Sequence, residues 1–212
     1  MPKATFFNLP DDKRNLIISS AIEEFSGAGY DMASINRICR KSGIPKGSFY
    51  QYFEDKLDLY AYIMGLAISE KVKFFSDELV EFQNLTLFEQ IRLLFLKGLE
   101  FAKKHPQYAA LGEKFSKENN ETARSAVIKE GDRQSETLFI RMIDDAKDRG
   151  EIDRNTDSLA LSLLLQSLNN AVNKYMLEKY GNADYEHNQE NVNRFVDSLL
   201  SIISDGVRNR TD

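Results

Sequence analysis

The sequence predicts an all-α protein of about nine helices. Only four of its 212 residues are proline and eleven are glycine, and this scarcity of helix breakers favours helix throughout. Apolar residues recur at intervals of three and four along most of the chain, which is the periodicity of a helix with one buried face. No segment of useful length alternates between apolar and polar residues, so we expect no β-sheet.

Breaks in this pattern divide the chain into three parts. We expect residues 1–10 to form a flexible N-terminal tail, residues 11–58 a small helical module, and residues 59–212 a larger helical domain. Asp11 or Asp12 can cap the first helix of the module. That helix ends at a glycine-containing run, because glycine readily takes the backbone conformation that terminates helices.

The segment 34–53 predicts two short helices joined by a tight turn. Ser34 is a good N-cap, because its hydroxyl can accept a hydrogen bond from a free N–H of the first turn. Gly43 stands where the first helix must stop, and Pro45 suits the first position of the next helix. Phe49 and the aromatic residues three and four positions after it give the second helix an apolar face. Two short helices around such a turn form a helix-turn-helix.

Charge indicates what the exposed face of this motif meets. Residues 32–53 contain no acidic side chain, although the whole chain has a net charge of −5. Their basic side chains are those of Arg37, Arg40, Lys41 and Lys46. A DNA-binding surface needs cations for phosphates and polar groups for base edges, and the outer face of the second helix offers Lys46, Ser48, Tyr50 and Gln51. A solvated helical hairpin with ordinary lysines is the alternative that composition leaves open.

The run GIPKGSFYQYFEDKLDL, residues 43–59, resembles the recognition helix of the TetR family of bacterial regulators. The matching positions are Gly43, Pro45, Lys46, Gly47, Ser48, Phe49, Tyr50, Tyr52, Phe53, Lys56 and Leu59. The upstream run KRNLIISSAIEEFSGAGYDMASINRIC is similar to that family's first helix and the start of its second, so the resemblance covers about residues 10–60. It implies the family's fold and its role as a DNA-binding transcriptional regulator.

The motif and the resemblance together define a set of expected DNA-binding residues. Lys56, in the first turn of the following helix, is placed for a phosphate because a helix N-terminus adds backbone donors and a favourable dipole. The full set is Ser34, Arg37, Lys46, Gly47, Ser48, Tyr50, Gln51, Tyr52 and Lys56.

The helix that begins at Lys56 leads into the larger domain, where further breaks predict five more helices. The last two of these helices are unusually apolar, and their stripes are too broad for one contact face. That they only cover the domain's own core is the alternative. In the TetR family the equivalent pair forms a four-helix bundle across a two-fold axis, so the resemblance implies a homodimer. Its expected interface residues are Leu168, Val172, Phe195, Leu199, Ile202 and Ile203.

The middle helices are rich in large apolar side chains, and the resemblance implies a ligand pocket among them. Plain core packing is the alternative for these side chains. Polar residues at spacings of 4, 3 and 4, starting at Ser162, form one stripe on a leucine-rich helix. The stripe either faces water or orients the polar end of an apolar ligand. The expected effector-binding residues are Phe95, Phe115, Phe139, Met142, Gln166, Asn169 and Asn173.

The sequence contains no motif that predicts catalysis. It has no cluster with metal-ligand spacing, no glycine-rich phosphate loop and no nucleophile elbow, so we expect no enzyme, no cofactor and no metal. The single cysteine, Cys39, fits a reducing cytoplasm and a packing role. No apolar run is long enough to span a bilayer, and the N-terminus does not resemble a signal peptide, so we expect a cytoplasmic protein.

These observations predict a homodimeric repressor that binds a palindromic double-stranded DNA operator and is released by a small, largely apolar effector. One alternative is a DNA-binding protein of the same fold without an effector, acting in chromosome organisation or through a protein partner. The other is an enzyme or binding protein that has merely retained the fold, and the basic face of residues 34–56 argues against it.

Overall fold

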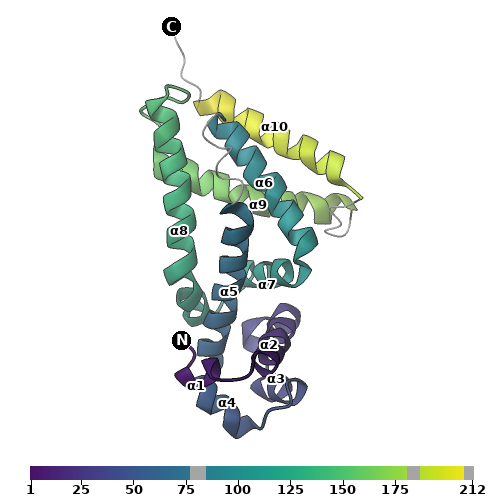
Figure 1. The fold of residues 1–212 in the computed structure, drawn as a ribbon. Helices are drawn as coiled ribbons and strands as arrows, with labels where there is room; N and C mark the ends of the chain where they lie inside the picture. The colour runs from purple at the N-terminus through teal and green to yellow at the C-terminus, as the bar shows by residue number, and fades with distance from the viewer. Residues whose placement is uncertain (77–84, 181–186, 208–212) are drawn as a thin grey trace. The chain divides into compact units, whose positions relative to one another are not determined.

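The computed structural model describes the backbone of residues 1–76, 85–180 and 187–207 and confirms an all-α fold (Figure 1). In that part of the chain there are ten helices and no β-strand. Nine of the ten correspond to the predicted helices, and the additional one is α1. Their bounds are α1 Ala4–Phe7, α2 Asp11–Met32, α3 Ile35–Lys41, α4 Lys46–Tyr52, α5 Lys56–Ser76, α6 Leu87–Lys104, α7 Pro106–Ser116, α8 Glu121–Asp148, α9 Ser158–Tyr180 and α10 Gln189–Val207.

The chain packs into two compact units. The first comprises Met1–Phe74 and Lys104–Arg133, and the second comprises Phe75–Lys103 and Gln134–Asp212. These units group residues by packing. The division by role, with a boundary near residue 58, therefore stays a prediction.

In the first unit, α2 packs against both α7 and α3. Ile17, Ala21 and Phe25 lie one turn apart on α2 and are fully buried, because positions four apart share one face of a helix. The aromatic rings of Phe25 and Tyr60 meet edge to face at 4.9 Å between centroids. Such contacts between large buried side chains make this unit a well-packed support for the short helices α3 and α4.

In the second unit, α9 packs against α10. The core is built from one face of each helix, with further side chains from α6 and the last part of α8. On α9 and α10 the buried apolar residues are Leu161, Leu165, Leu168, Val172, Met176, Val192, Val196 and Leu200. The stripes predicted on these helices therefore supply the core of their own unit first.

The structure corrects the expectation of a flexible tail over residues 1–10. Lys3 N donates to Tyr52 O at 2.8 Å, and the short helix α1 follows at once. The side chain of Phe6 is fully buried among aromatic side chains of the first unit. Burying a phenylalanine is worth about 1.5–3 kcal/mol, which offsets part of the backbone entropy of about 1–2 kcal/mol per residue that ordering this segment costs.

The turn between α3 and α4 depends on Gly43, whose φ is +67°. Ile44 N donates to Cys39 O at 3.0 Å and so closes the end of α3, the six-to-one bond of a glycine-terminated helix. An added Cβ at Gly43 would meet no atom within 4 Å. The requirement for glycine here is therefore one of backbone conformation, not of space.

We predict that Gly43→Ala lowers the free energy of unfolding by about 1–2 kcal/mol, the cost of a left-handed conformation in a residue with a Cβ. The matched control is Gly27→Ala in α2, which also has open space around its Cα but lies in helical backbone. It should raise stability by up to about 1 kcal/mol. Urea unfolding of both variants checks the pair, and a loss at Gly43 no larger than at Gly27 would contradict the argument.

Candidate nucleic-acid interface

The helix-turn-helix forms as the sequence predicts. Ser34 caps α3, its Oγ accepting from Arg37 N at 3.4 Å, and the cap prediction is thereby confirmed. Phe49 and Tyr52 turn inward from α4. Because a seven-residue helix has little stability of its own, this buried aromatic face is what holds α4 in place.

The opposite face of α4 is open to solvent. Lys46, Gly47 and Gln51 are exposed and Ser48 is partly exposed. Tyr50 is 46% exposed, with its ring edge-on to that of Phe49 at 5.2 Å. An aromatic residue that keeps half of its surface in water on a short amphipathic helix is unusual for a core residue and suits a contact surface.

The four basic side chains of the motif divide into two pairs. Arg37 and Lys41 form ion pairs with Glu24 and Glu23 of α2. Within the described part of the chain, the exposed side chains of Arg40 and Lys46 have no hydrogen bond or ion pair. Only these two present free charges. Arg40 was absent from the expected DNA-binding residues, although the charge count that pointed to the motif already included it.

Arg37 serves the fold in this structure. Its Nε donates to both carboxylate oxygens of Glu24, at 2.8 and 3.1 Å, and its Nη2 donates to Met32 O at 2.7 Å. Glu24 Oε1 also accepts from Ser34 N at 2.8 Å. Arg37 thus fastens α3 to α2 through an acceptor thirteen residues upstream, and its expected role in DNA binding stays a prediction.

Lys56 is likewise occupied within the protein. Its Nζ lies 2.7 Å from Tyr30 O, 3.1 Å from Asp31 O and 3.3 Å from Ala33 O, and 4.5 Å from the centroid of the Tyr30 ring. All three ammonium hydrogens thus have backbone acceptors at the end of α2. Lys56 therefore stabilises the connection between α2 and α3, and its expected phosphate contact stays a prediction.

Tyr52 is the third residue of the expected set that the structure places elsewhere. It is 7% exposed, and its ring lies 6.3 Å from that of Phe6. Three residues after Phe49, it falls on the same inward face of α4. Its match to the family pattern therefore reflects packing.

The expected effector-binding residues are distributed over both units. Phe115 packs at the edge of the first core, with the Arg124 guanidinium 5.5 Å from its ring centroid. Phe95, Phe139 and Met142 pack in or against the second core. The structure therefore assigns these four side chains to two cores.

The polar stripe on α9 starts inside the protein. Ser162 is fully buried, and its Oγ accepts from Gln166 Nε2 at 2.9 Å. The interpretation of the stripe as a solvated strip is thus wrong at this end. The side chains of Asn169 and Asn173 lie outside the described residues.

The residues expected at the dimer interface differ in how far they are buried. Leu168 and Val172 are buried in the core of the second unit, so they are not free to meet a partner. Phe195 stacks on Tyr175 at 4.1 Å, and Leu199 and Ile203 are partly exposed. Ile202 is 71% exposed. Further large apolar side chains that the sequence did not single out are exposed on α9: Leu159, Leu163 and Leu164.

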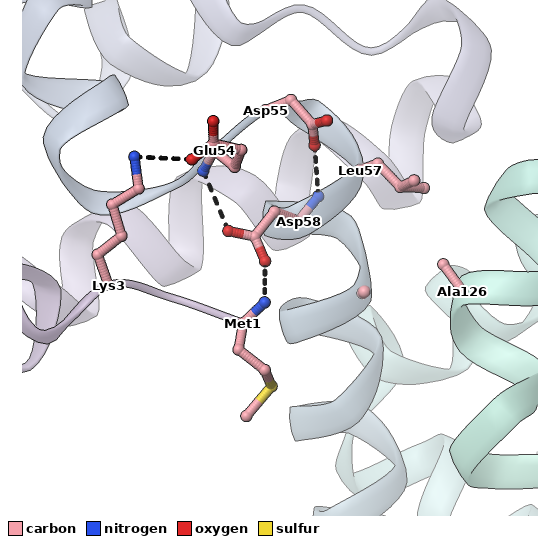
Figure 2. A pocket seen from close by; sticks show the side chains of 8 residues that line it. Met1, Lys3, Glu54, Asp55, Leu57, Asp58 and Ala126 are labelled. Carbon is pink, nitrogen blue, oxygen red and sulfur yellow. Dashed lines mark hydrogen bonds and ion pairs between the residues drawn. The ribbon is translucent and has the colours of Figure 1, made fainter.

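An open hollow of about 550 Å³ lies beside the start of α5 (Figure 2). Two ion pairs lie along it: Lys3 Nζ lies 2.9 Å from Glu54 Oε2, and the amino group of Met1 pairs with Asp58. None of the expected effector residues lines it. We therefore do not assign the effector to this hollow.

The described residues contain neither a metal-binding cluster nor a membrane-spanning helix. No group of three or more histidine, cysteine, aspartate or glutamate side chains is arranged to hold a metal ion in that part of the chain. No helix of that part is both long enough and apolar enough to cross a membrane.

We predict a pH dependence of stability from Glu24. The hydrogen bond from Arg37 lowers the pKa of Glu24 below its ordinary value of 4.5, although burial opposes this shift and the Ser34 N–H adds to it. A carboxylate with a lowered pKa stabilises the fold fully above its ordinary pKa, and this contribution is lost as the pH falls through the lowered value. Glu24→Gln should therefore be less stable than the parent at pH ~7, and the difference should shrink as the pH falls below the ordinary pKa of 4.5.

The measurement is chemical unfolding at a series of pH values. Glu23→Gln is the control, because the ion pair of Glu23 with Lys41 is exposed on both sides and contributes little in water. A stability difference between parent and Glu24→Gln that does not shrink as the pH is lowered would show that the carboxylate charge is not what matters.

Comparison with known proteins agrees with this arrangement. The model of the family described as bacterial regulatory proteins, tetR family, matches residues 17–63, which contain α3, the turn and α4. An uncharacterised HTH-type transcriptional regulator of Bacillus subtilis strain 168, YhgD, is 28% identical over 116 residues. That match covers 55% of this chain and 58% of the relative, so the chain spans less than two thirds of the relative's length.

Solved structures share the fold over nearly the whole chain. A TetR family transcriptional regulator from Chloroflexus aurantiacus J-10-fl has a TM-score of 0.73 at 28% identity, covering 99% of this chain and 100% of that one. The regulator FadR from Bacillus subtilis, solved with stearoyl-CoA, has a TM-score of 0.72 at 15% identity, covering 92% and 99%. Residues 17–63 thus match the DNA-binding module of bacterial tetR family regulators, and the chain shares the fold of a TetR family transcriptional regulator.

Proposed function

We propose that this regulator is a repressor that acts as a homodimer on a palindromic operator in the bacterial cytoplasm and is released by a small, largely apolar effector. In this proposal residues 11–58 bind DNA, and residues 59–212 bind the effector and form the dimer. The observation that carries the proposal is the outer face of α4, where Lys46, Tyr50 and Gln51 are exposed.

The chemistry of that face fits DNA recognition by α4, which we call the recognition helix. Lys46 and Arg40 carry free charges that suit phosphates. Gln51 has an amide that can pair with the edge of adenine in the major groove, and the Tyr50 hydroxyl can donate or accept. Since phosphate contacts position a protein and base contacts specify sequence, the two kinds of side chain divide the task between them.

A dimer can recognise a longer stretch of DNA than one recognition helix can. At 1.5 Å per residue the seven residues of α4 are about 10 Å long, which is enough for only a few base pairs. Two copies related by a two-fold axis read two half-sites about 34–36 Å apart, or a little more. The exposed Ile202 on α10 and the exposed leucines on α9 support these helices as the interface, because removing apolar surface from water favours association.

The proposed effector is supported by a polar pair on α9 and by a protein of the same fold. Ser162 and Gln166 form a buried to half-buried polar pair on a leucine-rich helix, and apolar pockets use a few such groups to orient a ligand. FadR, which shares the fold, was solved with stearoyl-CoA, and an apolar ligand for this chain is consistent with that. An effector releases DNA only through different affinities for two conformations.

The alternative is the same DNA-binding protein without an effector. Operator binding that no apolar ligand shifts would favour the alternative, whereas release by such a ligand would favour the proposal. We propose no catalytic role, because the related proteins are regulators.

We predict that Lys46→Ala weakens DNA binding and makes the plot of log affinity against log salt shallower by about 0.9, the contribution of one phosphate contact. Tyr50→Ala should weaken binding by about 1–3 kcal/mol if the hydroxyl reads a base. The probe is DNA selected from a random pool by the parent protein. Lys117→Ala, directly after α7, removes an equal charge from an exposed ion pair and is the control. Unchanged binding by both Lys46→Ala and Tyr50→Ala, with intact folding, would remove the proposal.

We predict that Ile202→Glu converts the dimer to a monomer. Ile202 is exposed in the single chain, so the substitution leaves the fold intact, but an unpaired charge buried at an interface costs about 3–5 kcal/mol. Ser201→Glu is the matched control, since neighbouring positions on a helix face different directions. Sedimentation at micromolar concentration measures the result. A parent protein that already sediments as a monomer would contradict the prediction.

A further inference from the structure

The last turn of α4 has backbone carbonyls that its own helix does not satisfy. Phe53 N donates to Phe49 O, and the next amide, that of Glu54, turns away and donates to Asp58 at 3.1 Å. The carbonyls of Tyr50, Gln51 and Tyr52 follow, and they belong to the group that every helix leaves without an internal donor at its C-terminus.

The N-terminal segment, residues 2–8, supplies a donor to each of these carbonyls. Lys3 Nζ donates to Tyr50 O at 3.0 Å, Thr5 Oγ1 donates to Gln51 O, and Lys3 N donates to Tyr52 O at 2.8 Å. We call this segment the arm. Three consecutive carbonyls of a seven-residue helix are thus bound by a part of the chain some 46 to 49 positions upstream.

Phe6 anchors the arm. Its side chain is fully buried, and its ring centroid lies 4.8 Å from that of Phe53 and 5.5 Å from that of Tyr62. Phe53 directly follows α4, so the anchor and the hydrogen bonds act on the same end of the helix.

The charge of Lys3 is used inside the protein. Figure 2 shows its ammonium directed at the carboxylate of Glu54, 2.9 Å away. A cation at a helix C-terminus also interacts favourably with the helix dipole. With these partners, Lys3 is placed to hold α4 and not to meet a phosphate.

We propose that the arm holds the last turn of the recognition helix in the conformation that reads DNA. The inference rests on the proposed function of α4. Tyr50 and Gln51 carry the side chains proposed to contact bases, and the arm binds the backbone carbonyls of the same two residues. A helix this short frays when its end is not supported, and a frayed end must be ordered again on binding, which reduces the apparent affinity by the fraction of competent molecules.

The sharpest variant is Thr5→Val, which removes the hydroxyl donor without changing charge or size. The parent protein first selects its DNA from a random pool, and failure at that step would refute the proposed function itself. With the selected DNA, Thr5→Val should bind about three- to ten-fold more weakly, the value of one hydrogen bond, while Thr5→Ser should bind like the parent. Equal affinities for parent, Thr5→Val and Thr5→Ser would overturn the inference.

The salt dependence separates positioning from direct contact. Lys3→Met should weaken binding while leaving the slope of log affinity against log salt close to that of the parent. A slope shallower by about 0.9 would show that Lys3 meets a phosphate itself and would overturn the role assigned to it.

A second pair of variants distinguishes a local effect from general loss of stability. Phe6→Ala removes the buried anchor, and Phe7→Ala removes a neighbouring ring that is half exposed. In Phe6→Ala the amides of Tyr52 and Phe53 should exchange faster with deuterium than in Phe7→Ala, while the amides of α2 keep the protection seen in the parent. Equal loss of protection in α2 and α4, or no change in α4, would contradict the inference.

Discussion

Four consecutive backbone carbonyls, those of residues 30–33, are bound by two cations, and the position of the helix-turn-helix depends on this arrangement. Lys56 takes three of the carbonyls and Arg37 takes the fourth, that of Met32. Glu24 then binds both Arg37 and Ser34 N, which joins the body of α2 to the N-cap residue of α3. Hydrogen bonds to charged groups are the stronger kind, so the direction in which α3 leaves α2 is fixed by side chains instead of by a long loop.

The same arrangement explains how much of the site could be predicted. The helices, the Ser34 cap and the Gly43 turn depend on neighbouring residues, so the sequence showed them directly. The roles of Arg37 and Lys56 depend on acceptors 13 and 26 positions away. Nothing in a count of charges tells a cation that binds a carboxylate of the same chain from one that is left free. The charge pattern therefore locates the basic motif, but it does not reveal that Arg37 and Lys56 have acceptors within the chain.

The burial of apolar side chains was also hard to predict from the sequence, because it too depends on distant residues. Periodicity places Leu168 and Ile202 correctly on helical stripes, but one is buried in the core and the other is exposed, because packing against other helices decides which stripe is covered. Phe6 escaped prediction for a related reason. A segment of ten residues is too short to show periodicity, and its anchor is a set of aromatic rings more than forty positions downstream.

These contacts also restrict how DNA binding by such a protein can be switched. The recognition helix is held at its start by the Gly43 turn, along its inner face by Phe49 and Tyr52, and at its end by the arm. Reshaping α4 would require breaking several of these contacts together, since packed cores have few intermediate arrangements. Changing the distance between two intact copies of the helix-turn-helix in a dimer breaks none of them. If an effector controls this regulator, the less costly route is therefore to change the spacing of the two helix-turn-helix motifs in a dimer. The affinity for a palindromic operator would then fall, because the two motifs would no longer fit their half-sites at the same time.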